Sequence, residues 1–178
     1  MRIGIAGTQS TGKTTLLNAL RSEKIFKDYA ICDEVTRWVK SIGVNINENG
    51  SDITQELIMM KHIHNVFMYD DMLTDRTAID GLVYSKWLYN KNKINTVTLE
   101  NVKRVFYKLI GKYNYIFFIE PEFNIEDDGI RSTDVQFRDE INDIFIAVIK
   151  EKNIPVIKIT GSVRQRVNQV LENINERN

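Results

Sequence analysis

Residues 7–14 read Gly-Thr-Gln-Ser-Thr-Gly-Lys-Thr, a complete G-x-x-x-x-G-K-[ST] pattern that directly follows the apolar run 3–6. A buried strand, a glycine-rich turn and a helix that opens near Lys13 aim backbone N–H groups and a positive helix end at one anionic group. Lys13 suits the outer phosphates of a nucleotide, and the Thr14 hydroxyl suits Mg²⁺. The sequence therefore predicts a nucleoside triphosphate site that takes ATP and Mg²⁺. The residues expected to contact the nucleotide are Gly7, Thr8, Gln9, Ser10, Thr11, Gly12, Lys13, Thr14 and Thr15.

Two carboxylates, Asp33 and Glu34, lie at the end of the second predicted strand. If the phosphoryl acceptor is an alcohol, it must lose a proton, and Glu34 at the end of a strand is placed to receive it. Asp33 points to the opposite side if the strand continues, so Glu34 is the preferred base. The alternative is that Glu34 is a surface acid that caps the helix containing Trp38. Trp38 itself is either an aromatic wall for a base or part of the core.

An acid and a cation follow the third predicted strand, as Asp75 and Arg76. A carboxylate beside the phosphate loop can hold Mg²⁺, so Asp75 and Thr14 are the predicted metal ligands. The alternative for Asp75 is a helix N-cap. The planar fork of Arg76 can clamp a phosphate or a sugar hydroxyl in the acceptor pocket, or it can pair with a nearby carboxylate.

Two arginines lie in or near a polar, glycine-containing segment at about 121–135, which we interpret as a lid. Arg131 and Arg138 could bring positive charge onto the transferring phosphoryl group. The alternative is a solvated loop followed by a charged helix face. Ser162, after the last strand, is expected near the base of the nucleotide, although a helix start alone would explain it. His62 and His64 are two residues apart on a predicted helix, so they are poor metal ligands, and neither is expected to be catalytic.

The bulk properties limit the class of protein. The chain has 178 residues, which fits one domain over 1–178. Its 24 basic and 24 acidic residues balance, so no general attraction to nucleic acid or to an anionic membrane is expected. With one cysteine the chain has no disulfide framework. The chain begins on a strand-like segment without a signal-peptide pattern and has no apolar run long enough to span a bilayer. We therefore expect a cytoplasmic location.

Apolar runs rich in β-formers alternate with helical patterns, which predicts an α/β fold with a parallel sheet covered on both faces. Strands are expected near 2–6, 29–33, 72–75, 114–119 and 154–159, and helices near 13–22, 53–70, 80–91, 98–112, 134–152 and 162–176. In the second helix Leu57, Met60, Ile63 and Phe67 fall near one face, and Asp52 could cap it. Functional residues should then gather at the carboxyl ends of the strands.

Together these segments resemble the P-loop nucleoside and nucleotide kinases. Residues 34–38 (Glu-x-x-x-Trp) and the Asp-Arg pair at 75–76 are similar to deoxynucleoside and thymidylate kinases. Segments 128–131, 137–138 and 161–166 are similar to NadR-type nicotinamide riboside kinase domains. The resemblance implies a three-layer fold with five parallel strands and a small lid, in which Lys13, Thr14, Glu34, Asp75, Arg76 and Arg131 are the working residues. The chain departs from deoxynucleoside kinases, which commonly have Pro after the strand-two Glu and Glu-Arg-Ser after strand three.

The sequence thus predicts an ATP- and Mg²⁺-dependent phosphotransferase acting on a small nucleoside-like acceptor, of deoxynucleoside or nicotinamide riboside type. One alternative is a thymidylate-type kinase, whose acceptor is already an anionic phosphate. Others are a kinase acting on a nucleotide within a nucleic acid, which the balanced charge disfavours, and a regulatory NTP-binding ATPase. The identity of the acceptor depends on the shape of its pocket. That shape depends on how residues pack, among them Trp38, Met59, Phe67, Tyr84 and Trp87. The sequence leaves the oligomeric state open.

Overall fold

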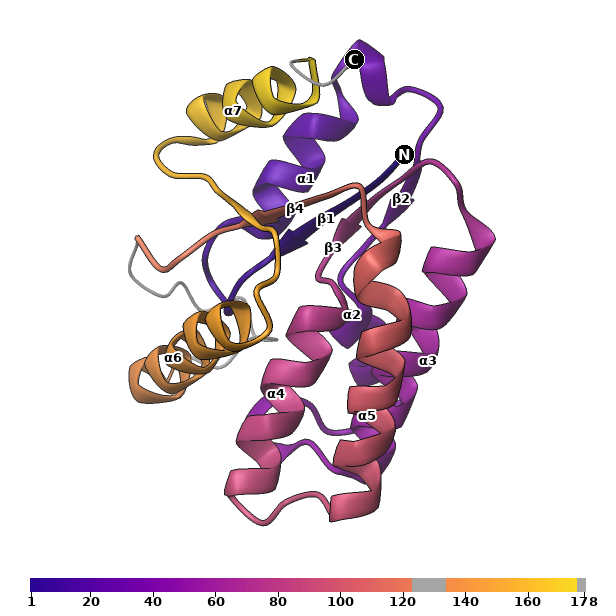
Figure 1. Cartoon of the computed structure of the whole chain (residues 1–178), viewed down its shortest axis with the longest axis vertical. Helices are drawn as coiled ribbons and strands as arrows, with labels where there is room; N and C mark the ends of the chain where they lie inside the picture. The colour runs from indigo at the N-terminus through magenta and orange to yellow at the C-terminus, as the bar shows by residue number, and fades with distance from the viewer. Residues whose placement is uncertain (123–133, 176–178) are drawn as a thin grey trace.

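A computed structural model of the chain describes residues 1–122 and 134–175. Within these residues five parallel strands form one sheet in the order β2-β3-β1-β4-β5 (Figure 1). They are β1 Arg2–Ala6, β2 Ala30–Cys32, β3 Met72–Asp75, β4 Tyr115–Phe118 and β5 Ile157–Lys158. The predicted five-stranded parallel sheet is confirmed, although most strands are shorter at their ends than the apolar runs suggest.

Seven α-helices accompany the sheet in the described residues. They are α1 Lys13–Arg21, α2 Val35–Ser41, α3 Asp52–Met68, α4 Ala78–Asn90, α5 Thr96–Leu109, α6 Val135–Glu151 and α7 Val163–Asn175. Short 3₁₀ turns occupy Lys24–Phe26, Asn47–Asn49 and Ile110–Lys112. All six predicted helices are present. The short helix α2, which carries Trp38, adds a seventh.

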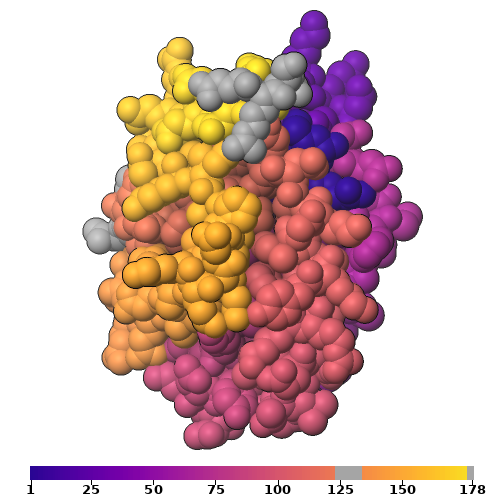
Figure 2. All heavy atoms as spheres, in the orientation of Figure 1, coloured from indigo at the N-terminus to yellow at the C-terminus, as the bar shows by residue number. Residues whose placement is uncertain are grey.

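The helices form two layers, one on each face of the sheet. On one face α1 and α7 pack against β1 and β4, around Leu16, Leu20, Phe117 and Val170. On the other face α3, α4, α5 and α6 enclose a larger core (Figure 1). In the space-filling view, atoms coloured from salmon to yellow fill most of the visible face, and only a few dark indigo atoms reach it (Figure 2). The three-layer α/β architecture is therefore as predicted.

The buried face of α3 differs from the predicted one. Met60, Ile63 and Phe67 are exposed, whereas Met59, His62 and Val66 point inward. The helix carries apolar residues on more than one side, so periodicity alone could not choose between the stripes. Its N-cap is Ser51 and not Asp52, because Ser51 and Thr54 form a reciprocal capping box.

The carboxyl ends of the central strands meet at one edge of the sheet. Strand β1 pairs in parallel with β3, with Ile5 opposite Asp75, and with β4, with Ala6 opposite Phe118. The phosphate loop leaves β1 at this edge, Asp75 ends β3, and β2 on the far side of β3 leads into Glu34. The topology thus brings together residues that are about 20 to 60 positions apart in the chain.

Candidate active site

The phosphate loop has the backbone shape that its glycines allow. Gly7 and Gly12 have φ angles of 146° and 84°, in the region that side chains disfavour. A Cβ atom at Gly7 would lie 2.3 Å from the carbonyl oxygen of Ile119, so only glycine fits there. After Gly12 the chain turns directly into α1, whose first residue is Lys13. The loop therefore faces the start of α1, where anions are stabilised by unpaired N–H groups and the helix dipole.

Lys13 lies folded against its own loop. Its Nζ donates hydrogen bonds to the carbonyl oxygen of Thr8 at 2.5 Å and to Thr11 Oγ1 at 3.4 Å. Burial, together with the nearby positive charge of Arg76, lowers the pKa of Lys13 to about 8, against the opposing attraction of Asp75 and other carboxylates. A phosphate held by the loop would add a close negative partner for this buried ammonium group.

The other loop residues divide into buried and exposed ones. Thr8, Gln9 and Thr11 are buried, and Gln9 Oε1 accepts hydrogen bonds from Thr8 Oγ1 at 2.6 Å and from Tyr84 OH at 2.8 Å. Ser10 adopts a positive φ of 57°. Thr15 lies on the exposed side of α1, so its side chain points away from the buried part of the loop.

Thr14 and Asp75 meet where a magnesium ion is expected. Thr14 Oγ1 donates a hydrogen bond to Asp75 Oδ2 at 2.5 Å, and Asp75 Oδ1 is buried without a hydrogen-bond partner among the described residues. Burial, assisted by Glu34, raises the pKa of Asp75, while Lys13 and the Thr14 hydroxyl lower it. One hydroxyl and one carboxylate are the protein ligands that a hydrated Mg²⁺ commonly uses, and the orphaned oxygen fits such an ion. The alternative of an N-cap does not hold, because Thr77 caps α4.

Glu34 and Arg76 form a buried ion pair beside this site. Arg76 donates from Nε at 2.9 Å and from Nη2 at 2.7 Å to the same oxygen, Glu34 Oε1. Arg76 Nη1 lies 3.7 Å from Asp80 Oδ1, and Arg37 lies 3.4 Å from Glu34 on its outer side. Glu34 is only 4% exposed and makes no capping bond to α2, so it is neither a surface acid nor a side-chain cap. Arg76 has a φ of 80°, a strained conformation of the kind often found at functional sites.

Asp80 stabilises the turn between β3 and α4 through hydrogen bonds. Its Oδ2 accepts hydrogen bonds from Thr77 N at 2.8 Å and Thr77 Oγ1 at 3.0 Å, and its Oδ1 lies 3.4 Å from Gly7 N. Burial raises the pKa of Asp80, against the attraction of Arg76 and Lys13. One carboxylate thus ties the capping box of α4 to the phosphate loop and to the Arg76 pair.

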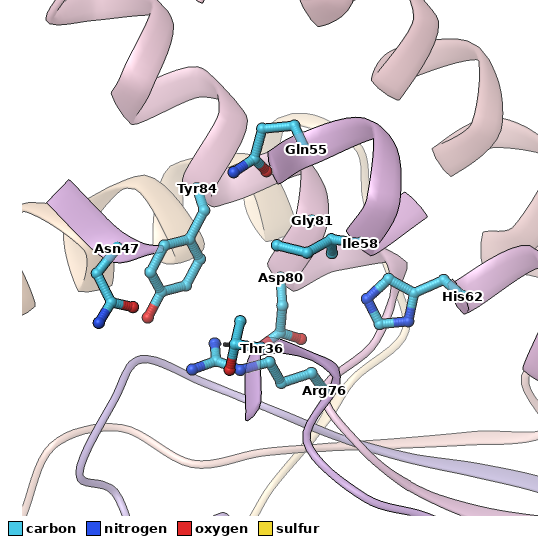
Figure 3. A pocket seen from close by; sticks show the side chains of 9 residues that line it. All are labelled: Thr36, Asn47, Gln55, Ile58, His62, Arg76, Asp80, Gly81 and Tyr84. Carbon is cyan, nitrogen blue, oxygen red and sulfur yellow. Dashed lines mark ion pairs between the residues drawn. The ribbon is translucent and has the colours of Figure 1, made fainter. Parts of the chain in front are cut away.

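A small pocket with a cavity volume of about 20 Å³ lies next to the ion pair, between α2, α3 and α4 (Figure 3). It is lined by Thr36, Asn47, Gln55, Ile58, His62, Arg76, Asp80, Gly81 and Tyr84. A cavity of this volume holds about one water molecule, so a nucleoside can enter only if the surrounding side chains move apart. Of the aromatic residues expected to shape an acceptor site, only Tyr84 lines this pocket. Trp38 is exposed and lies, with Thr14 and Glu34, along an adjoining groove, so it is not part of the core.

Three further predicted site residues have different outcomes. Arg138 lies on α6, and its carbonyl oxygen is 3.4 Å from Thr8 Oγ1, so the structure brings this position to the phosphate loop. Ser162 is exposed before α7, where its hydroxyl bonds Gln165 Oε1 at 2.9 Å, as a helix start would require. Arg131 and most of the predicted lid lie in 123–133, outside the described residues.

Tyr84 was expected to shape the acceptor site, whereas the roles of Arg166, Gln55 and His62 at the site were not predicted. Arg166 on α7 is buried and donates from Nη1 to the carbonyl oxygen of Thr11 at 2.6 Å, with Glu122 at 3.3 Å from Nη2. Tyr84 joins the pocket to Gln9, and Gln55 faces the pocket while accepting a hydrogen bond from Ser85 Oγ at 2.9 Å. One sequence feature could have identified Gln55 and His62 as site residues. Each is a polar residue among the apolar residues of α3.

Comparison with known proteins agrees with the fold. The family model described as AAA domain matches residues 2–166. No curated protein matches the chain. Among solved structures, a NadR protein "in complex with NR" has a TM-score of 0.72 at 19% identity, covering 98% of this chain and 50% of that one. The chain thus spans about half the length of that NadR protein.

Two further solved structures match over nearly their whole length. Deoxyadenosine kinase from M. mycoides, with products bound, has a TM-score of 0.68 at 13% identity, covering 99% of this chain and 100% of that one. YorR protein from Bacillus subtilis, in complex with phosphorylated GDP, has a TM-score of 0.61 at 14% identity, covering 98% and 96%. These matches confirm the resemblance in fold to P-loop nucleoside kinases. Across 1–122 and 134–175, no helix is both long and apolar enough to cross a membrane.

Proposed function

Given that this chain belongs to the AAA domain family, we propose that it is an ATP- and Mg²⁺-dependent kinase that phosphorylates a hydroxyl group of a nucleoside. The observation that carries the proposal is the position of Glu34. This buried carboxylate shares a groove with Thr14 on one side and bonds Arg76, which lines the acceptor pocket, on the other. An acid between the metal site and a pocket is placed to receive the proton of an acceptor hydroxyl.

The charge of the pocket supports a neutral acceptor over a nucleoside monophosphate. Arg76 is the one Lys or Arg side chain among the residues that line it. This cation is already bonded to Glu34 and lies 3.7 Å from Asp80, so little of its charge is left for a second phosphate. An anion in a buried site needs paired cations, which the described part of the pocket does not offer.

In the proposed reaction, the loop amides and Lys13 hold the β- and γ-phosphates. Thr14 and Asp75 would hold Mg²⁺, which would supply positive charge against the phosphate oxygens. Arg76 fixes Glu34 in one orientation, and Glu34 accepts the hydroxyl proton as the acceptor oxygen attacks the γ-phosphorus in line with the leaving oxygen. Arg138 and Arg131 are proposed to add positive charge at the transferring group. The related NadR and deoxyadenosine kinase structures support a nucleoside as the acceptor.

The test is a panel of acceptors incubated with Mg·ATP and analysed by mass spectrometry. The panel holds deoxyadenosine, deoxycytidine, thymidine, nicotinamide riboside, thymidine monophosphate and a short DNA oligonucleotide. The proposal predicts a phosphate on at least one nucleoside and none on the monophosphate. A gain of phosphate on the monophosphate or the DNA alone would replace the proposal with the corresponding alternative. ATP hydrolysis without any phosphorylated acceptor would favour a regulatory ATPase.

A further inference from the structure

Among the described residues that line the acceptor pocket, His62 is the one with a buried side-chain polar atom that has no hydrogen-bond partner. It lies on α3, is 2% exposed, and its ring points toward Arg76 and Asp80 across the pocket (Figure 3). Its Nε2 atom is buried and makes no hydrogen bond to any of the residues that the structure describes. Buried polar atoms in folded proteins almost always have a partner, so an orphan that faces a pocket requires an explanation.

The surroundings of His62 keep the ring neutral. Burial, with a smaller contribution from the positive charge of Arg76, lowers the pKa of His62 to about 4. At neutral pH the ring therefore carries one donor and one acceptor nitrogen and no charge. Such a ring recognises an uncharged polar group better than a phosphate, because it offers an anion no net attraction.

Met59 fills the pocket wall beside the ring. A Cβ atom at Gly81 on α4 would lie 2.4 Å from the sulfur of Met59 and 3.8 Å from His62 Cδ2. The missing side chain therefore lets Met59 pack closely against α4 next to the imidazole. Gln55, seven residues earlier on α3, lines the same pocket. Seven residues of helix rise about 10 Å, so the two polar side chains are spaced to contact different parts of one small ligand.

We propose that His62 is a specificity-determining residue, whose Nε2 forms a hydrogen bond with an uncharged group of the acceptor, on its heterocycle or on its sugar. This inference rests on the proposed function, because it takes the pocket to be the acceptor site. It assigns a role to a residue that the sequence pattern set aside, since a histidine need not bind a metal or move a proton to be functional.

The first test compares His62→Leu with His64→Leu, for which the chain supplies a matched control. His64 lies on the same helix two residues away and is exposed. For His62→Leu, kcat/KM for the nucleoside should fall roughly 10- to 100-fold, the range expected when a buried hydrogen bond to a ligand is lost, while KM for ATP changes little. His64→Leu should keep both values, and His62→Gln should recover part of the loss. An unchanged kcat/KM in a folded His62→Leu protein would overturn the proposal.

Analogue substrates identify the group that His62 contacts. Adenosine is compared with purine riboside, which lacks the exocyclic amine, and with its 3′-deoxy form. With the wild type, kcat/KM should be lower for the analogue that lacks the contacted group than for adenosine. With His62→Leu, kcat/KM should be the same for both substrates, because the two changes remove the same bond. Additive losses for every analogue would contradict a direct contact.

A second readout does not depend on turnover or on the folding of a variant. The chain has only two histidines, so the nitrogen resonances of ¹⁵N-histidine-labelled wild type can be assigned with His64→Gln. Each nucleoside of the panel is added without ATP, and the proposal predicts a shift of the His62 Nε2 resonance with at least one. If a nucleoside shifts this resonance but gains no phosphate, the proposed function fails and the His62 contact stands. If a nucleoside is phosphorylated while the resonance stays in place, the contact fails and the proposed function stands.

Discussion

Both nitrogen donors of the Arg76 fork that face Glu34 converge on one carboxylate oxygen, Oε1, at 2.9 and 2.7 Å. This geometry fixes the direction of the carboxylate, because a single rotation of either side chain would break both bonds. The pair is buried on both sides, at 3% and 2% side-chain exposure, so its loss is not compensated by water. Glu34 is thus held in one orientation between the metal site and the pocket.

Arg76→Lys should therefore lower kcat by about tenfold or more while the fold and ATP binding persist. A lysine keeps the charge but cannot present two donors in a fixed plane. Arg76→Met should instead destabilise the protein by about 3–5 kcal/mol, because Glu34 and Asp80 are left buried without their cation. Steady-state kinetics and urea unfolding measure the two effects. Equal activity of Arg76→Lys and the wild type would show that the two-donor geometry is unimportant.

Tyr84 connects the acceptor pocket to the phosphate loop through its 2.8 Å hydrogen bond to Gln9 Oε1. Tyr84→Phe removes this bond but keeps the ring that lies 5.0 Å from the Arg76 guanidinium. We expect a loss of about 1 kcal/mol in unfolding free energy and a higher KM for both substrates, since the loop and the pocket lose their shared contact. Tyr89→Phe, an exposed tyrosine on the same helix, is the control. A change confined to one of the two KM values would argue against a link between the sites.

Arg166 supports the phosphate loop from α7. Its Nη1 donates to the carbonyl oxygen of Thr11 at 2.6 Å, which helps to keep the adjoining peptide groups oriented. Arg166→Met should weaken Mg·ATP binding roughly tenfold or more, the effect of losing one hydrogen bond from a charged donor. Arg164→Met, on the exposed side of the same helix, should bind ATP as the wild type does. Isothermal titration calorimetry gives the dissociation constant of Mg·ATP for both variants. Similar values would show that Arg166 does not support nucleotide binding.

The low pKa of His62 predicts a pH-dependent stability. The unfolded chain takes up a proton near pH 6.5, whereas the folded protein keeps the ring neutral down to about pH 4. Protonation therefore favours the unfolded state, and this residue removes up to about 1.4 kcal/mol of stability per pH unit as the pH falls between these values. Burial raises the pKa values of Asp75 and Asp80, which act in the opposite direction in every variant.

The difference between wild type and His62→Gln isolates this contribution. Urea unfolding at about pH 7.5 and about pH 5 should show that the wild type loses more stability than His62→Gln on acidification. His64→Gln should follow the wild type, because its ring is exposed. A wild type and a His62→Gln protein that weaken in parallel would mean that His62 is not held neutral.

Much of the fold followed from local pattern. The run before Gly7 and the helix after Lys13 fix the phosphate loop, and the acids after β2 and β3 are placed by the rule that functional groups gather at the carboxyl ends of parallel strands. Helix α3 shows where local pattern fails. Its inward face is chosen by α2, α4 and α5 packing around it, and the sequence holds apolar residues on both candidate stripes.

The pairings within the site also lay beyond the sequence. Glu34 and Arg76 are 42 residues apart, and Arg166 reaches Thr11 across 155 residues. Such contacts depend on the strand order and on side-chain directions that no short window specifies. The spacing of His62 and His64 argues only against metal binding, and the sequence does not show that His62 is buried. Its burial beside Arg76, on which the proposed neutral hydrogen-bonding role depends, is visible only in three dimensions.

The most direct test of the account is the single-turnover rate of γ-phosphoryl transfer to a nucleoside by Glu34→Gln. The amide keeps the shape and still accepts a hydrogen bond from Arg76, but it cannot accept the acceptor's proton. We predict a rate about 10²–10⁴-fold below that of the wild type. Mg·ATP at about 100 times its dissociation constant should still stabilise the variant by roughly 2.7 kcal/mol, seen as a higher melting temperature. A rate within about threefold of wild type, with nucleotide binding intact, would contradict the assignment of Glu34 as the base and with it the alcohol acceptor.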